Sequence, residues 1–207
     1  MKLNHKRLSK GLVFNTLSDV YYYSSNGTMA TVYSKPSKII TLTNSKGEFK
    51  NYDVVKNTVS LSNGLDYSSN HSFIYYFLNN KEKDLGFSEN GFKLVKTEIK
   101  DGLKITTWIP SSDNPQISKI ELVHEKYSPI YTGFYDKSGN IFYKCYYSKY
   151  TMISCYSLPL SITEIEFDSP IDSTITKKVY SDFKVNNGVE EMYRNYKIPS
   201  NAKVVQF

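Results

Sequence analysis

The stretch from Gly27 to Val59 constrains the fold of this 207-residue chain more than any other. Between Thr28 and Tyr33, β-prone side chains fall into two alternating sets, which is the period of a strand with two different faces. Pro36 cannot donate to a β-ladder, so the strand is expected to bend, stop or lie at an edge there. A second extended run follows, and the turn signal at Asn44–Gly47 then reverses the chain. This order of elements predicts a curved antiparallel sheet.

The rest of the chain repeats the pattern of extended runs separated by turns. Phe92–Ile99 and Leu103–Ile109 flank the dipeptide Asp101-Gly102, which is typical of a hairpin turn. Further strands are predicted at residues 117–123, 130–135, 141–154, 161–167 and 174–185. Only Ser72–Asn79 and residues 190–193 suggest helix. The sequence therefore predicts a mainly β fold.

Composition sets bounds on domain number and partners. A chain of this length can bury one core, and no linker-like stretch divides it, so we predict a single domain over residues 1–207. Its 19 Tyr and 11 Phe lie among polar residues, as in a sheet with one apolar and one solvated face. The net charge of +6 is spread along the chain and is densest at Lys2–Lys10. Because no clustered basic stripe is present, nucleic acid is not an expected partner.

The order of elements around Pro36 resembles the outer-membrane lipoprotein carrier superfamily of the LolA/LolB type, in a divergent Bacteroides-type branch. The shared pattern is a strand ending in a basic residue and Pro, a second strand, a Gly turn and a Tyr-Asp pair. The matching positions are Gly27, Lys35, Pro36, Gly47, Tyr52, Asp53 and Val59. The likeness continues at residues 84–87, 106–110, 131–150 and 198–199. The family usually has Arg where this chain has Lys35, and Lys lacks the planar fork of donors that Arg offers.

The resemblance implies a strongly curved antiparallel sheet, a half-barrel, with one or two short helices covering its concave face. The family usually opens with an amphipathic helix. Only a short segment precedes Asp19 in this chain, so residues 1–18 are expected to be irregular or to form a reduced N-terminal helix.

Two features of the sequence bear on where in the cell the protein is located. Met1–Arg7 is basic but is not followed by the apolar stretch of a signal peptide, so none is expected in this chain. No run approaches the roughly 18 apolar residues that a membrane-spanning helix needs. The resemblance implies a periplasmic or outer-membrane-associated protein. Its export signal would then have been removed, or the sequence would be incomplete.

A single sheet with one apolar face needs a cover, and the aromatic segment at 72–79 is the natural candidate. Alternation places Leu103 and Ile105 on one face of their strand, opposite Thr106 and Trp108. Two outcomes are open, an ordinary filled core or a cavity for an acyl chain. The residues predicted to line such a hydrophobic cavity are Phe73, Tyr76, Phe77, Leu103, Ile105, Ile120, Leu122, Phe134, Ile165 and Phe167.

No catalytic or metal-binding motif stands out. The three histidines are far apart and have no Cys or carboxylate at ligand spacing, so no metal and no cofactor are predicted. Glu164, Glu166 and Asp168 share a strand face, and paired carboxylates are what a glycosidase uses. Because Ile165 and Phe167 lie opposite them, a solvated outer face is the favoured interpretation, and no catalytic residue is predicted.

The two cysteines are predicted to be free thiols. The residues between Cys145 and Cys155 contain no Gly, Pro, Asn or Asp, which indicates one long strand. Ten strand residues separate their Cα atoms by about 30 Å, whereas a disulfide allows about 7 Å.

Together with the resemblance, these features predict a non-catalytic monomer that binds acyl chains of lipids or lipoproteins in the cell envelope. It would serve lipoprotein trafficking to the outer membrane and meet an envelope protein partner. The alternative is an envelope-associated structural or protein-interaction module with a filled core. A remoter alternative is a carbohydrate-active enzyme that uses Glu164 and Glu166.

Overall fold

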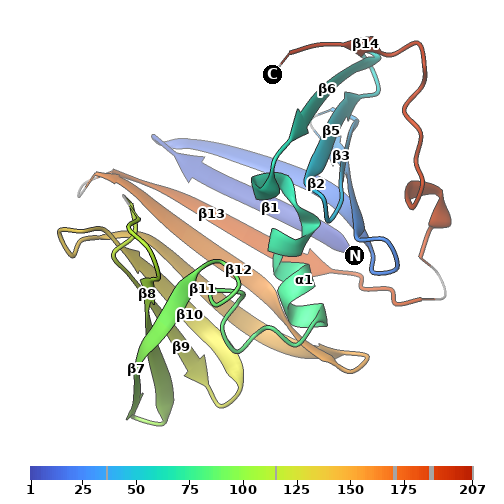
Figure 1. Ribbon diagram of the computed structural model, residues 1–207. Helices are drawn as coiled ribbons and strands as arrows, with labels where there is room; N and C mark the ends of the chain where they lie inside the picture. Colours follow the sequence, from blue (N-terminus) through green and yellow to red (C-terminus); the bar gives the residue numbers. More distant parts are fainter. Residues whose placement is uncertain (36, 115, 170–171, 187–188, 207) are drawn as a thin grey trace. The chain divides into compact units, whose positions relative to one another are not determined.

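The computed structural model describes residues 1–35, 37–114, 116–169, 172–186 and 189–206 (Figure 1). The first half of the chain contains β1 (Lys2–Ser9), β2 (Leu12–Tyr23), β3 (Thr28–Lys35), β4 (Ile39–Thr43), β5 (Glu48–Asp53), β6 (Thr58–Asn63), the short 3-10 helices η1 (Leu65–Tyr67) and η2 (Ser69–His71), α1 (Phe73–Leu78) and β7 (Phe92–Lys100). The second half contains β8 (Leu103–Pro110), β9 (Lys119–Glu125), β10 (Ser128–Tyr135), β11 (Ile141–Ile153), β12 (Tyr156–Ser169), β13 (Asp172–Ser181), η3 (Glu191–Tyr193) and β14 (Lys203–Val204). The predicted mainly β fold and the predicted helix at 72–79 are confirmed.

The strands form one open sheet in the order β14-β6-β5-β4-β3-β2-β1-β13-β12-β11-β10-β9-β8-β7. From β2 to β6 and from β7 to β13, each strand pairs antiparallel with its neighbour in sequence. The short β14 runs parallel to β6. The prediction of an open antiparallel sheet is confirmed, while the bend predicted at Pro36 lies outside the described residues.

The chain divides into two compact units. Unit 1 comprises residues 1–5, 15–75 and 180–207, and unit 2 comprises residues 6–14 and 76–179. The strands β1, β2 and β13 and the helix α1 each contribute residues to both units. The single domain expected over residues 1–207 stays a prediction.

The N-terminal residues form a β-hairpin, so the expectation of an irregular segment or reduced helix at 1–18 is wrong. Lys10 and Gly11 connect β1 to β2 with φ of 49° and 73°, the left-handed values that a tight two-residue hairpin turn requires. The backbones of Met1 and Val20 exchange hydrogen bonds of 2.8 and 3.0 Å, which fixes the pairing of the two strands. The turn chemistry of Lys-Gly therefore overrides any helical tendency of the segment.

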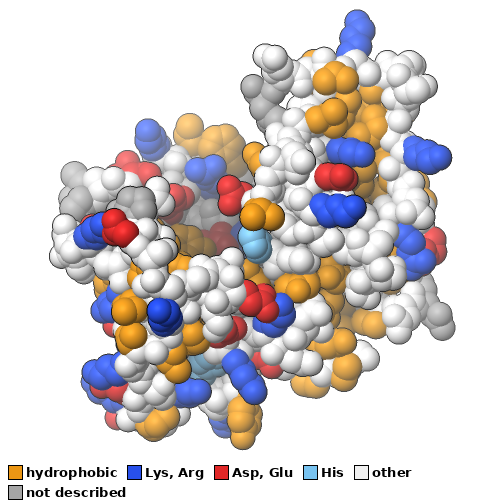
Figure 2. Space-filling model, viewed as in Figure 1, with side chains coloured by type: hydrophobic (Ala, Val, Ile, Leu, Met, Phe, Trp, Pro, Cys, Tyr) orange, Lys and Arg blue, Asp and Glu red, His pale blue; other side chains and the backbone are white. Residues whose placement is uncertain are grey.

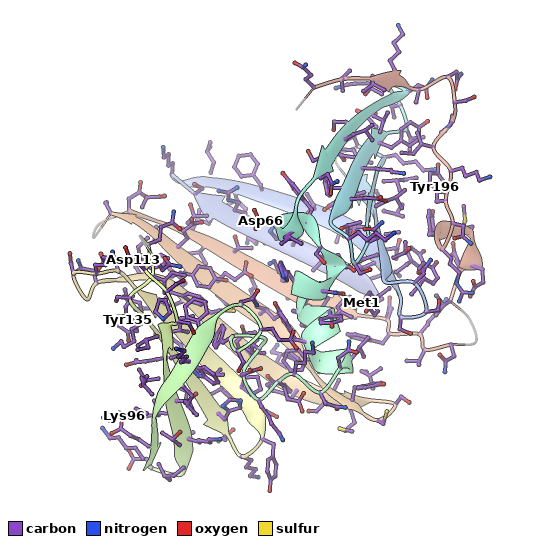
Figure 3. All side chains as sticks on the ribbon, in the orientation of Figure 1. Met1, Asp66, Lys96, Asp113, Tyr135 and Tyr196 are labelled. Carbon is purple, nitrogen blue, oxygen red and sulfur yellow. The ribbon has the colours of Figure 1, made fainter. Side chains whose placement is uncertain are left out.

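In unit 1, one face of the β2–β6 sheet carries the core. Its buried members are Tyr23, Ala30, Ile40, Leu42, Tyr52, Val59 and, from the C-terminal segment, Tyr193. Residues Val189, Tyr196, Ile198 and Ala202 of the same segment pack against this core (Figure 3). The C-terminal segment, residues 189–205, therefore covers this face of unit 1.

In unit 2, strands β7 to β13 form a bent sheet. The pairing register shifts in four places, at Leu94/Lys96, Pro129/Tyr131, Phe134/Tyr135 and Phe167/Ser169. Such bulges bend a strand and increase its twist, and this produces the curvature predicted for the sheet. Figure 2 shows charged and hydrophobic side chains interspersed over the visible surface of the molecule.

Candidate functional site

The register of unit 2 decides which side chains share a face of its sheet. One row of cross-strand partners runs Thr106, Leu122, Thr132, Cys145 and Glu164. The next row runs Trp108, Ile120, Phe134, Tyr143 and Glu166. We call the face that carries these two rows the covered face. Ile120 and Leu122 have no exposed surface, and Thr106, Trp108, Thr132 and Cys145 are also buried, so this face forms the interior of the unit.

The segment from Tyr76 to Gly91, called here the cover segment, packs on the covered face (Figure 1). Phe87 lies at its centre, where its ring meets those of Trp108 and Phe134 edge to face at 5.9 and 6.0 Å. Phe77 lies 6.3 to 6.4 Å from the rings of Tyr147 and Tyr150. Edge-to-face contacts of this kind add to the stabilisation from burial alone.

The cover segment holds its own shape through turns. The Asp84 carboxylate accepts hydrogen bonds from the backbone of Gly86 and from Ser88, and Lys81 forms an ion pair with Glu89 at 2.6 Å. Leu85 has φ +48° and Gly86 has φ +78°. A Cβ at Gly86 would come within 2.5 Å of the Tyr76 ring, so this position needs glycine. The left-handed conformation of Leu85 is strained and is maintained by the burial of its side chain.

Two sets of hydrogen bonds lie beneath the cover segment. Trp108 donates its indole N–H to Thr106 at 3.0 Å, and the Thr106 hydroxyl donates to the Leu122 carbonyl at 3.1 Å. His124 Nε2 lies 3.0 Å from the Glu82 carbonyl oxygen, which joins β9 to the cover segment. The Nδ1 atom of His124 and one carboxylate oxygen of Glu82 are buried without a hydrogen-bond partner in the described structure. Burial lowers the pKa of His124, so the ring is neutral at pH 7.

A polar cluster lies at the β11–β13 side of the covered face. Lys178 forms an ion pair with Glu164 at 2.7 Å, and both side chains are half-buried. The Cys145 thiol lies beside the Tyr143 and Tyr147 side chains. Burial raises the pKa of the Cys145 thiol to about 12 and also raises the pKa of Tyr143. Because a thiolate is the reactive form, Cys145 is a poor nucleophile at neutral pH.

The ten residues predicted to line one cavity do not share a face. Ile120, Leu122 and Phe134 lie on the covered face, and Phe77 packs against it. The register places Leu103, Ile105, Ile165 and Phe167 on the opposite face, where the Lys144 ammonium lies 5.1 Å from the Phe167 ring centre. Phe73 packs on Tyr180 in unit 1 at 4.6 Å, and Tyr76 packs on Gly86. The inward direction predicted for the four residues of the opposite face is therefore wrong.

The carboxylates of β12 also need a correction. Glu164 and Glu166 do share a face opposite Ile165 and Phe167, as predicted. That face is the covered one, whereas a solvated outer face was expected. Glu166 and Asp168 lie at its exposed margin, and Glu164 is half-buried in its ion pair.

Both cysteines are free, as predicted. The predicted single strand between them is wrong at its end, because Ser154, with φ +57°, turns the chain and Ile153 pairs with Tyr156. Cys145 is buried on β11 and Cys155 is exposed in the turn.

Sequence reasoning missed Leu85, Phe87 and Trp108 as parts of the site. Apolar side chains in a turn-rich segment are a weak signal, although Leu85 and Phe87 belong to the motif that carries the family resemblance. No helix in the described part of the chain is long and apolar enough to cross a membrane.

No family model and no curated protein matches the sequence. Solved structures do match. A LolA superfamily protein from Nitrosomonas europaea has a TM-score of 0.59 at 12% identity, over 93% of this chain and 87% of that one. A DUF1329 family protein from Desulfovibrio piger has a TM-score of 0.59 at 16% identity, over 94% and 88%. A domain named for outer membrane lipoprotein sorting, from Vibrio parahaemolyticus, has a TM-score of 0.58 at 14% identity, also over 94% and 88%.

These likenesses cover nearly the whole chain, while the identities are too low to carry residue roles. They confirm the predicted resemblance to the LolA/LolB-like superfamily at the level of the fold. The chain has a LolA-like fold.

Proposed function

We propose that this protein binds acyl chains of lipids or lipoproteins, without catalysis, in the cell envelope. The observation that carries the proposal is the covered face of unit 2, an apolar and aromatic sheet surface beneath a short segment of turns. The LolA-like fold supports it, since one solved structure with this fold is named for lipoprotein sorting.

The covered face offers the chemistry that an acyl chain needs. Ile120, Leu122 and Phe134 present an apolar surface, and the neighbouring hydroxyls and indole N–H are already hydrogen-bonded. An acyl chain would take the place of Phe77, Leu85 and Phe87, which occupy this surface in the free protein. Each methylene buried there would contribute about 0.8 kcal/mol. Because those three side chains would lose their own burial, affinity depends on how easily the cover segment moves.

The polar cluster supports a role without chemistry. Glu164 is held by Lys178, and the Cys145 thiol stays protonated at neutral pH. Neither group has the free, activated form that a general base or a nucleophile requires.

A second function is favoured by one observation, the complete burial of Ile120 and Leu122 beneath Phe87 and its neighbours. A unit filled in this way by its own side chains would be a structural or protein-interaction module. In that case the cover segment is an ordinary part of the core, and a ligand does not displace it.

Titration with a fluorescent fatty acid separates the two functions. We expect saturable binding by the wild type and a changed affinity in Phe87→Ala, since Phe87 competes for the surface. The matched control is Phe167→Ala, which removes the same side chain from the opposite face of the same sheet. It is expected to leave the affinity unchanged. Absence of binding by the wild type, or equal effects of both substitutions, would contradict the proposal.

A further inference from the structure

The β1–β2 hairpin ends in a turn at one end of its two strands (Figure 1). The side chains around this turn are apolar and basic, and the proposed acyl site does not use them. We call residues 6–14, which belong to unit 2, the hairpin tip. Leu12, Val13 and Phe14 are 63%, 56% and 55% exposed, and Leu8 is 39% exposed. Large apolar side chains gathered in this way on an exposed element are a mark of an interaction site.

The apolar side chains lie on both faces of the ribbon. The bonds between Met1 and Val20 and between His5 and Thr16 set the cross-strand pairing. Continued to the turn at Lys10-Gly11, this pairing places Leu8 opposite Val13 on one face and Arg7 opposite Phe14 on the other. Leu12 shares the face of Phe14, two residues along the strand.

One edge of the tip is also open. Among the residues that the structure describes, the pairing of β2 with β3 begins at Leu17 with Lys35, so residues 12–16 of β2 have a described partner strand on the β1 side alone. The tip therefore presents two apolar faces and one unpaired backbone edge to its surroundings.

The charged side chains of the hairpin tip are all basic. The first 17 residues contain Lys2, Lys6, Arg7 and Lys10 and no Asp or Glu. Lys2 pairs with Asp182 at 2.9 Å. Lys6, Arg7 and Lys10 are exposed, and none of them forms an ion pair with any residue that the structure describes. Three free cations thus surround the apolar side chains.

We propose that the hairpin tip docks on an anionic phospholipid surface. The apolar side chains enter the boundary between headgroups and acyl chains, and the three cations contact lipid phosphates. A membrane interface surrounds an inserted ribbon and so accepts apolar groups on both of its faces, whereas a protein groove contacts chiefly one face. Water among the headgroups satisfies the unpaired edge. This docking does not depend on acyl binding at the covered face, so the two proposals fail separately.

Vesicle co-sedimentation tests the proposal with two vesicle compositions, phosphatidylglycerol mixed with phosphatidylcholine, and phosphatidylcholine alone. We expect binding to the anionic vesicles to be stronger by about tenfold or more and to weaken as salt is added. The double substitution Leu12→Ser with Phe14→Ser, and the triple substitution of Lys6, Arg7 and Lys10 by Gln, are each expected to reduce binding by about tenfold or more.

The matched control is Leu94→Ser with Val95→Ser on β7, whose side chains are 50% and 53% exposed, similar to those of the tip. It is expected to bind like the wild type, and urea unfolding of each variant checks that the fold is kept. Equal vesicle binding by the tip variants and the wild type would overturn the proposal. Binding of an acidic peptide without binding of anionic vesicles would also overturn it, and would assign the tip to a protein partner.

Discussion

The covers of the two units are built differently. In unit 1 the C-terminal segment is tied by backbone pairing, since β14 adds to β6 and Val205 donates to the Val59 carbonyl at 2.9 Å. Tyr193 of this segment stacks on Tyr21 at 4.7 Å. In unit 2 the backbone hydrogen bonds of Leu85, Phe87 and Asn90 close turns inside the cover segment, and side chains make most of its contacts with the sheet. Its backbone reaches the sheet through three carbonyls, those of Glu82, Phe87 and Gly91.

This difference in how the covers are attached indicates which of them can move. A strand in a ladder leaves only when its backbone hydrogen bonds break together. A segment whose backbone hydrogen bonds are mostly internal can lift while it loses side-chain burial and only a few hydrogen bonds to the sheet. The strained Leu85 makes the closed position less favourable still. We therefore expect a structural role for the cover of unit 1 and, under the proposed function, a gating role for that of unit 2.

The largest effect is expected for Tyr193→Ala in unit 1. Tyr193 is 9% exposed and joins the C-terminal segment to the core, so its loss leaves a cavity that a paired strand cannot close. We expect the free energy of unfolding to fall by about 3 kcal/mol or more. Urea unfolding measures it, with Tyr193→Phe as the control that keeps the ring. If Tyr193→Ala lowers the free energy of unfolding no more than Phe87→Ala does, the two covers do not differ as argued.

A smaller loss is expected for Phe87→Ala in unit 2. The cover segment can settle into the vacated space, so we expect about 1 to 2 kcal/mol, below the usual cost of removing a core Phe. The same urea experiment measures it. A loss of about 3 to 5 kcal/mol would show that the cover segment is rigid core, and would favour the filled-core module.

The polar cluster of unit 2 gives a smaller effect. Glu164→Gln leaves the half-buried Lys178 without its partner and is expected to cost about 1 kcal/mol. Glu166→Gln, on the same strand and face but exposed, is expected to stay within about 0.5 kcal/mol. Equal costs for the two variants in thermal or urea unfolding would show that the ion pair contributes nothing.

The smallest effect is a pH dependence from His124. Its pKa in the folded protein lies below its ordinary value, chiefly through burial, with Lys104 acting in the same direction and Glu82 against it. The unfolded chain therefore binds a proton first as the pH falls. The contribution of His124 to stability is complete above about pH 6.5 and is lost as the pH drops below it.

Unfolding experiments at pH 7.5 and pH 5.5 measure this dependence. His124→Gln should flatten the change in stability between the two values. An unchanged slope in His124→Gln would show that other groups control the response to acid.

The sequence predicted most strands because alternation and Gly turns mark them locally. It missed the β1–β2 hairpin, since the family resemblance led to the expectation of an irregular segment or a reduced helix and the Lys10-Gly11 turn was not recognised. Alternation also separated the two faces of β8 correctly, but could not say which face is inside. Leu103 and Ile105 are apolar, yet Thr106 and Trp108 are the residues that face the interior, where they hydrogen-bond each other. A shift of one residue in the register moves every side chain of a strand to the other face. Only the pairing register therefore decides which face is buried.

Photocrosslinking with a fatty acid that carries a diazirine near its methyl end tests the central claim most directly. Mass spectrometry of the labelled protein then locates the acyl chain. The account predicts labels on the cover segment and the covered face, at positions such as Phe77, Phe87 and Leu122, and competition by unlabelled fatty acid. Labels at Ile105 or Phe167 on the opposite face, or no labelling that unlabelled fatty acid displaces, would contradict it.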